Sequence, residues 1–409
     1  MEKFDYGIIG GGPAGYTAGM FLAKKGHSVV LFEKDKLGGT CLNRGCIPTK
    51  SFLHSSEVYS QIKKSEEFGL KFENLEFDFS KVIEKKDKTV EKIRKSLELA
   101  VKNSGVKVVY QEAEIKDNNR ILAGEEEFSL GEIIIAVGAK PREIKGLEFD
   151  GEFILSSDDI LNIKKLPKSV LIVGSGAIGI EWARILNNFD VEVSVVEMQE
   201  HLVPIADIEV SKRVERIFKK DGIKYYLNNW ITKIENKVVT LKDGVEISPD
   251  FILVAVGREP VCLKSLNNPV LGDACGEIQL AHYAIHQAKE FALGIPYEKN
   301  LIPSVIYGNP EIAWVGLREQ DCDENCSKTM LPITALGKAW CDDATEGFIK
   351  IIVKNNEIVG AHIVSKEASS LIHTLLVAIQ NKLSVNDLKK MCFAHPTYAE
   401  GIFDILVNL

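Results

Sequence analysis

Hydrophobic and polar residues are distributed along this chain in a pattern that predicts parallel sheets covered by helices. Apolar runs at residues 5–9 and 170–173 each lead into a glycine-rich turn and then into a helical pattern. Apolar runs at residues 28–32 and 192–196 predict a second strand in each copy. Strand, glycine turn, helix and strand form the repeating unit of a doubly wound α/β fold. We therefore expect two Rossmann-like dinucleotide-binding domains in one chain.

The rest of the chain adds helices and a domain of a different kind. Residues 79–102 are strongly charged, with apolar residues at near-helical spacing, which predicts a helix packed by one face. From about residue 301 the pattern changes to mixed strands and helices, with an apolar helix at 369–380. We expect a first domain over residues 1–150, completed by about 258–300, a second over 151–257, and an α+β domain over 301–409.

Both glycine turns have the spacing of a dinucleotide-binding fingerprint in its required context. The glycines let the backbone approach a pyrophosphate at the helix N-terminus, and the acid that ends the second strand can bind a ribose hydroxyl. The distance from the first glycine to this acid is the same in both copies. The residues are Gly10, Gly12, Gly15 and Glu33 in the first copy, and Gly174, Gly176, Gly179 and Glu197 in the second.

Length, charge and composition exclude several classes of protein. A chain of 409 residues is too long for one ordinary core, and its net charge of −8 argues against a nucleic-acid surface or a polybasic membrane patch. Glycines interrupt the apolar run 6–23, so we expect neither a secretory segment nor a membrane span, and we expect a cytoplasmic protein. Cys322 and Cys326 lie in an acidic loop without companion ligands, so no metal site is expected there.

Cys41 and Cys46 are the pair of cysteines whose sequence context suggests a disulfide bond. Residues five apart in a regular helix are roughly 8–9 Å apart at Cα, whereas a disulfide needs less than about 7 Å. If the two pair, the backbone must leave regular helix, and Gly45 and Pro48 supply the freedom and the break. Two interpretations stay open on spacing alone: a pair of small buried hydrophobes, or a redox disulfide.

The segment around this pair, residues 38–50, resembles the active-site segment of the flavoprotein disulfide reductases, with most likeness to the dihydrolipoamide dehydrogenase branch. The resemblance covers nearly the whole chain in the same order. It implies a Cys41–Cys46 redox disulfide in an FAD-dependent oxidoreductase that oxidises dihydrolipoyl groups and reduces NAD. The partner would be a lipoyl-carrying protein, either the E2 of a 2-oxo acid dehydrogenase or a glycine-system carrier.

The resemblance also assigns the cofactors. An electron path needs two of them, which suggests FAD in the first fingerprint and NAD in the second. Glu197 would repel a 2′-phosphate, and residues 198–200 offer no arginine to hold one, so NAD is favoured over NADP. The resemblance implies a Lys50–Glu181 charge pair at the flavin. Further implied cofactor-binding positions are Gly39, Thr40, Lys50, Gly138, Glu181, Gly257, Asp273 and Ala281.

Near the C-terminus, His395 is followed five residues later by Glu400. A histidine with a nearby carboxylate can be a base with an orienting partner, although a lone histidine is more often structural. Residues 302–307 and 310–316 look like the family's dimerisation domain. The resemblance therefore implies a homodimer in which His395 reaches the partner's disulfide and Glu400 holds it.

One region departs from the family. Residues 261–271 replace a much longer connection that contains a strand before Gly272, and they leave only 269–271 for it. Either the FAD domain has lost a piece, or the natural chain is longer, which is what we expect. The alternatives to the proposed enzyme are another NAD(P)H-dependent disulfide reductase and a catalytically impaired flavoprotein subunit that acts as a scaffold. Glu197 argues against glutathione-type reductases.

Overall fold

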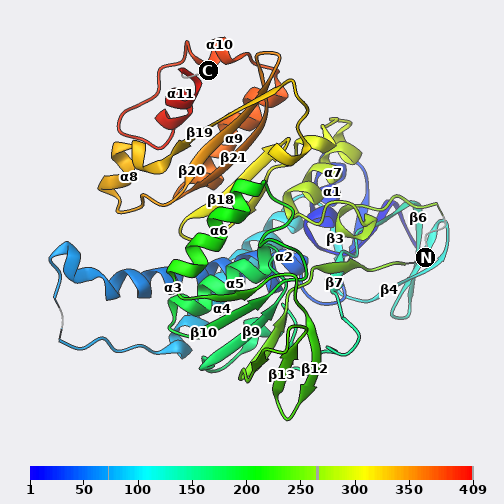
Figure 1. Ribbon diagram of the computed structural model, residues 1–409. Helices are drawn as coiled ribbons and strands as arrows, with labels where there is room; N and C mark the ends of the chain where they lie inside the picture. The colour runs from blue at the N-terminus through cyan, green and yellow to red at the C-terminus, as the bar shows by residue number, and fades with distance from the viewer. Residues whose placement is uncertain (72, 264–266, 408–409) are drawn as a thin grey trace.

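The computed structural model describes residues 1–71, 73–263 and 267–407. Two parallel-type sheets and one antiparallel sheet organise the chain (Figure 1). The antiparallel sheet and its helices, drawn from yellow to red, lie at the top of the view, and the second parallel sheet lies below them in green. This arrangement confirms the predicted fold class of two Rossmann-like domains and an α+β domain.

The first sheet is built around β1, which pairs in parallel with β2 on one side and β6 on the other. Its helix α1 (Pro13–Lys24) follows β1 directly and packs through Ala14, Ala18 and Leu22 against α7 (Ala281–Leu293). Its strands, in spatial order, are β3 (Lys107–Val109), β2 (Val29–Phe32), β1 (Glu2–Ile9), β6 (Glu126–Ile135), β5 (Arg120–Ala123) and β4 (Ala113–Asp117).

The second sheet repeats this design around β9, which pairs in parallel with β10 and β15. The helix α5 (Ala177–Asn188) follows β9, and α6 (Ile208–Lys220) follows β10. Its strands, in spatial order, are β11 (Lys224–Tyr226), β10 (Glu192–Val196), β9 (Ser169–Val173), β15 (Phe251–Val254) and β8 (Ile154–Leu155). A small antiparallel sheet beside it contains β12 (Ile231–Glu235), β13 (Val238–Leu241) and β14 (Glu246–Ile247).

The third domain is an antiparallel sheet covered on one face by α9 (Ala368–Gln380). Its strands are β17 (Ser304–Ile306), β18 (Glu311–Gly316), β21 (Glu357–Ser365), β20 (Phe348–Lys354) and β19 (Cys326–Pro332). The smaller helices of this part are η4 (Lys299–Leu301), η5 (Glu319–Asp321), η6 (Ile333–Ala335), α8 (Gly337–Cys341), α10 (Val385–Leu388) and α11 (Glu400–Val407).

Two long helices cross between the parallel sheets. The helix α3 (Cys46–Lys63) packs against α4 (Phe79–Asn103) and α5, with Phe52 between Phe79 and Trp182. As predicted, α4 is buried along one face, where Val90 and Val101 lie, although the apolar side chains of Ile93 and Leu99 are exposed. Short elements complete the chain: α2 (Gly39–Arg44), η1 (Ser65–Phe68), β7 (Ala139–Pro141), η2 (Ile160–Asn162), β16 (Arg258–Pro260) and η3 (Gly272–Cys275).

The short connection at 261–271 falls partly outside the described residues, which exclude 264–266. Residues 269–271 still reach the first sheet, because Ile135 N donates to Pro269 O at 2.9 Å and Leu271 N donates to Ile135 O at 2.8 Å. The strand expected before Gly272 is thus reduced to one parallel bridge, between Ile135 and Val270. That the natural chain is longer stays a prediction.

A buried charge cluster joins the second sheet to the antiparallel domain. Lys350 is 2% exposed, and its Nζ donates to Asp207 Oδ1 at 2.6 Å and to Glu319. Asp207 caps α6 by accepting from Glu209 N at 3.0 Å, and it also accepts from Glu319 N at 2.7 Å. Since the lysine and the aspartate come from different domains, the ion pair fixes one domain on the other.

Candidate active site

The predicted break between Cys41 and Cys46 is present. The helix α2 ends at Arg44, α3 begins at Cys46, and Gly45 separates them with φ −151° and ψ −111°. A Cβ at Gly45 would stand 3.0 Å from Thr40 O, so the turn favours a residue without a side chain. Pro48 lies in the first turn of α3, and without an N–H it cannot donate to the carbonyl of Arg44, the residue at which α2 ends. Its position fits the predicted break as well.

The two thiols are half-buried, and each shifts the pKa of the other. The hydrogen bond with Cys41, aided by the charge of Lys50, lowers the pKa of the Cys46 thiol to about 7. The same contact and burial raise the pKa of Cys41. Cys46 is therefore the residue that carries negative charge near neutral pH, as a thiolate leaving group requires.

Lys50 lies one turn beyond Cys46 and contacts Glu181 of α5. Its Nζ is 2.8 Å from both carboxylate oxygens, and Glu181 is almost fully buried, with its side chain 6% exposed. Tyr307 N donates to Glu181 Oε1 at 3.1 Å, and the Tyr307 ring lies 4.5 Å from Lys50 Nζ. The structure thus brings together the predicted pair and adds Tyr307, which the sequence did not indicate.

The first fingerprint has the shape that a pyrophosphate requires. Gly10 has φ +106°, and a Cβ at Gly15 would lie 1.8 Å from Gly10 O, so neither position accepts a side chain. Gly12 caps α1 without a side-chain hydrogen bond, and Gly39, at φ +56°, packs against it. The N–H groups at the start of α1 are therefore available to an anionic group.

The second fingerprint repeats this geometry. Gly174 has φ +97°, and a Cβ at Gly179 would lie 2.1 Å from Gly174 O. A Cβ at Gly176 would meet nothing within 4 Å, and Gly176 also caps α5 without a side-chain bond. The open space at Gly176 and the uncapped helix fit a bound dinucleotide.

Glu33 after β2 and Glu197 after β10 make the same kind of hydrogen bond, each to a backbone N–H of its own glycine turn. Glu33 Oε2 accepts from Gly11 N at 2.8 Å, and Glu197 Oε2 accepts from Ser175 N at 2.9 Å. Glu197 also accepts from Ser175 Oγ at 2.6 Å. Each carboxylate therefore holds the glycine turn itself. The predicted contacts of Glu33 and Glu197 with ribose remain proposals.

Arg258 connects the flavin-side elements and was not singled out from the sequence. Its Nη1 lies 3.0 Å from Asp158 Oδ1, its Nη2 donates to Ala139 O at 2.8 Å, and Thr40 Oγ1 lies at 3.5 Å. Within the described residues its buried Nε has no hydrogen-bond partner. Burial raises the pKa of Asp273, which the charge of Arg258 opposes. The unused Nε donor of Arg258 and the carboxyl group of Asp273 are suited to bind a polar ligand.

The glycines that end β6 and β15 join the crossing segments. Gly138 has φ +73° and accepts from Val261 N at 2.9 Å, and Gly257 has φ +98° and accepts from Arg142 N at 3.1 Å. Asp273 lies in η3, and Ala281 begins α7. The roles of these four positions in cofactor binding stay predictions.

His395 and Glu400 form the predicted pair in the antiparallel domain. His395 Nδ1 lies 2.9 Å from Glu400 Oε2, with the histidine 76% and the glutamate 15% exposed. Figure 1 shows α11, which begins at Glu400, well separated from α2. One chain therefore presents this histidine outward and does not bring it to its own cysteines.

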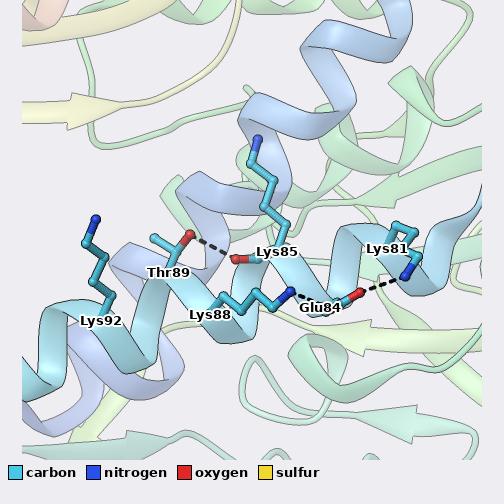
Figure 2. Close-up of a pocket in the computed structure, with 6 residues that line it drawn as sticks. All are labelled: Lys81, Glu84, Lys85, Lys88, Thr89 and Lys92. Atoms are coloured by element: carbon cyan, nitrogen blue, oxygen red, sulfur yellow. Dashed lines mark hydrogen bonds and ion pairs between the residues drawn. The ribbon is translucent and has the colours of Figure 1, made fainter.

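A shallow hollow on α4 lies apart from these residues. Figure 2 shows it lined by lysines around Glu84, which pairs with Lys81 and Lys88. We interpret it as a solvated helix face. Across the described residues, no group of three or more histidine, cysteine or acidic side chains could hold a metal ion, and none of their helices is long and apolar enough to cross a membrane.

Comparison with protein families agrees with this geometry. The Pyridine nucleotide-disulphide oxidoreductase family matches residues 4–280, and the dimerisation domain of the same family matches residues 302–404. A dihydrolipoyl dehydrogenase of Bacillus subtilis is 32% identical over 457 aligned positions, covering 98% of this chain and 96% of the relative. One of Chlamydia pneumoniae is 33% identical, covering 98% and 95%.

Solved structures show the same fold. LpdA from Mycobacterium tuberculosis superimposes with a TM-score of 0.90 at 23% identity, covering 100% of this chain and 99% of that chain. The flavoprotein disulfide reductase RclA from Escherichia coli gives a TM-score of 0.87 at 23% identity, covering 98% and 99%. The Bacillus alignment spans 457 positions against 409 residues here, so at least 48 of its positions have no counterpart in this chain.

Proposed function

The chain belongs to the pyridine nucleotide-disulphide oxidoreductase family, and from this we propose that it is an FAD- and NAD-dependent dihydrolipoyl dehydrogenase. The observation that carries the proposal is the Cys41–Cys46 pair on either side of the Gly45 break, with the Lys50–Glu181 ion pair one turn further on, in a chain with two dinucleotide fingerprints. The relatives of this name, which match across 98% of the chain, support the same choice.

The cofactor sites follow from the two fingerprints. FAD would be held by Gly10, Gly12, Gly15, Glu33 and Asp273, and NAD by Gly174, Gly176, Gly179 and Glu197. When bound, the flavin accepts electrons from the dithiol and the nicotinamide accepts a hydride. The corresponding domains are 1–150 with about 258–300 for FAD, 151–257 for NAD, and 301–409 for the interface.

The chain's own groups handle the thiols and the protons. His395 of one subunit removes a proton from a dihydrolipoyl thiol, and Glu400 stabilises the imidazolium that forms, through Nδ1. The resulting thiolate attacks Cys41 of the other subunit in its disulfide form. The Cys41–Cys46 bond breaks and Cys46 leaves as a thiolate beside the Lys50 ammonium.

The proposal includes a homodimer. The outward-facing His395 and the match to the family's dimerisation domain support it, because His395 does not lie at the cysteines of its own chain. The physiological partner would be a lipoyl-carrying protein, either the E2 of a 2-oxo acid dehydrogenase or a glycine-system carrier. A cytoplasmic location is part of the same proposal.

The decisive experiment compares Cys41→Ser, Cys46→Ser and His395→Ala in an assay of NAD reduction by dihydrolipoamide. We expect the cysteine variants to lose turnover and to keep FAD, because the glycines and not the thiols hold the flavin. His395→Ala should lower turnover by roughly 10²–10⁴-fold and spare flavin reduction by NADH. Cys341→Ser, at an exposed position, is the control. Turnover that survives in either active-site serine variant would reject the proposal.

One observation favours a second candidate, a catalytically impaired flavoprotein that acts as a scaffold. It is the reduced strand at 269–271, together with the positions that this chain lacks against the Bacillus relative. An enzyme gives a yellow preparation that NADH bleaches, whereas an impaired subunit does not. Activity on glutathione disulfide in place of dihydrolipoamide would indicate another disulfide reductase.

A further inference from the structure

A second cysteine pair lies far along the chain from the first, with Cys322 in the loop after β18 and Cys326 at the first residue of β19. Cys322 and Cys326 are four residues apart, and both are half-buried. Two backbone bonds shape the loop: Cys322 N donates to Glu319 O at 3.1 Å, and Cys326 N donates to Asp323 O at 3.2 Å. The second bond closes a tight turn that folds Cys326 back towards Cys322.

Charged groups surround this pair. Cys326 Sγ donates to Asp323 Oδ1 at 3.5 Å, and Lys354 Nζ pairs with Asp323 Oδ2 at 2.6 Å. Lys350 also acts on Cys322, whose thiol donates to Arg318 O at 3.3 Å. Burial, with the neighbouring Cys326, raises the pKa of Cys322 to about 11. Because this raised pKa keeps Cys322 protonated at neutral pH, we assign the first attack to Cys326.

We propose that Cys322 and Cys326 form a second dithiol–disulfide couple, which low-molecular-weight disulfides oxidise independently of the active site. The Cys326 thiolate attacks one sulfur of the external disulfide and releases one thiolate. Cys322 then gives up its proton and attacks the Cys326 sulfur of the mixed disulfide, which releases the second thiolate. The protein dithiol loses two electrons and two protons, and the external disulfide becomes two thiols.

The cysteine couple lies next to residues that join the antiparallel domain to the second parallel sheet's domain. The residues just before Cys322 hold the segment that precedes α6: Gln320 Oε1 accepts from Ile208 N at 3.2 Å, and Gln320 Nε2 donates to Ala206 O at 2.8 Å. Arg318 Nη1 donates to Ile205 O at 3.2 Å. A disulfide at Cys322 therefore constrains the loop that binds the antiparallel domain to the NAD-side domain.

The sequence allows a direct test on the FAD-bound protein. Trypsin releases residues 319–328 as one peptide whose only cysteines are Cys322 and Cys326, whereas Cys41 and Cys46 fall on separate peptides, 37–44 and 45–50. The reduced protein is incubated with oxidised glutathione, alkylated and digested without reductant. We expect peptide 319–328 to lose two hydrogen atoms and to resist alkylation until it is reduced.

Matched variants separate the steps. Cys322→Ser should stop at a glutathione adduct on Cys326, and Cys326→Ser should lose the ring-closed peptide entirely. Cys341→Ser should leave the ring closure of peptide 319–328 unchanged. Full alkylation of both cysteines under conditions that link peptides 37–44 and 45–50 would overturn the proposal. So would a wild-type protein that carries stable glutathione adducts on both cysteines without ring closure.

Discussion

Lys50 Nζ lies 2.8 Å from both carboxylate oxygens of Glu181, although 131 residues separate the two in the chain. The contact joins the cysteine-bearing helix α3 to α5, the first helix of the NAD-side domain. Glu181 is in turn held by Tyr307 N. The position of the Lys50 charge, which acts on Cys46, therefore depends on the three segments that carry Lys50, Glu181 and Tyr307.

Replacing Lys50 by methionine tests this link. The substitution keeps the apolar stem and removes the cation, whose charge helps to lower the pKa of Cys46. We expect that pKa to rise from about 7 by roughly 1 or more. The ultraviolet absorbance of the thiolate, followed against pH, measures it. Lys63→Met, at the other end of α3, is the control and should leave the titration unchanged. A titration of Lys50→Met that matches the wild type would show that Lys50 does not stabilise the thiolate.

Cofactor choice can be tested at Glu197. Arginine there exchanges repulsion of a 2′-phosphate for a charge-assisted contact, so the ratio of kcat/KM for NADPH over NADH should rise by about tenfold or more. Since Glu197 also holds Ser175 N and Oγ, we expect Glu197→Arg to be less stable as well. Glu192→Arg, on the same strand, is the control. A wild type that already prefers NADPH would contradict the assignment.

Two glycines of the second fingerprint should respond differently to alanine. A Cβ at Gly176 meets nothing within 4 Å, whereas one at Gly179 would lie 2.1 Å from Gly174 O. We therefore expect Gly176→Ala to fold normally and to raise the KM for NADH several-fold, because the methyl group occupies the space left for the pyrophosphate. Gly179→Ala should lower the thermal midpoint. Equal effects of both substitutions on folding would show that the space at Gly176 is not a ligand site.

His362 makes the stability depend on pH. Burial lowers its pKa to about 4 from 6.5 in the folded state. The unfolded chain takes up this proton first, so the contribution is fully present above pH 6.5 and is lost progressively as the pH falls towards about 4. Its Nε2 lies 2.8 Å from Leu317 O and 3.7 Å from Asp207 Oδ2, and the charges of Lys350 and Arg318 also act on it.

We expect His362→Gln to lose less free energy of unfolding between pH 7 and pH 5 than the wild type, by about 2 kcal/mol. Denaturant titrations at the two pH values measure this difference. His54→Gln, at an exposed position, should behave as the wild type. If His362→Gln keeps the wild-type difference between pH 7 and pH 5, His362 is not the group that titrates.

The sequence predicted best what local chemistry determines. Both fingerprints were predictable because Gly10 and Gly174 each need a positive φ next to a strand, and no other residue type serves there as well. The break at Gly45 was predictable for another reason, because a regular helix holds Cys41 and Cys46 too far apart to pair, and glycine and proline follow Cys41 closely. The Lys50–Glu181 pair came from a family resemblance, since nothing local connects residues on separate domains.

Contacts between distant segments could not be predicted in the same way. Arg258 was visible only as the residue after a glycine, yet it contacts Asp158, Ala139 and Thr40. The use of Glu33 and Glu197 to hold their own glycine turns was missed too, because the same residue type at that position also predicts a ribose contact. Such roles depend on which segments the fold brings together.

The buried Lys350 cluster has a consequence for exchanging domains between relatives. Lys350 belongs to the antiparallel domain, but its partner Asp207 belongs to the NAD-side domain. A chimera that replaces residues 301–409 with those of a relative without this lysine would leave Asp207 buried and unpaired, and removing one partner of a buried ion pair commonly costs about 3–5 kcal/mol. The parts that the sequence divides so clearly are therefore not freely interchangeable, and a functional hybrid must inherit positions 207, 319 and 350 as a set.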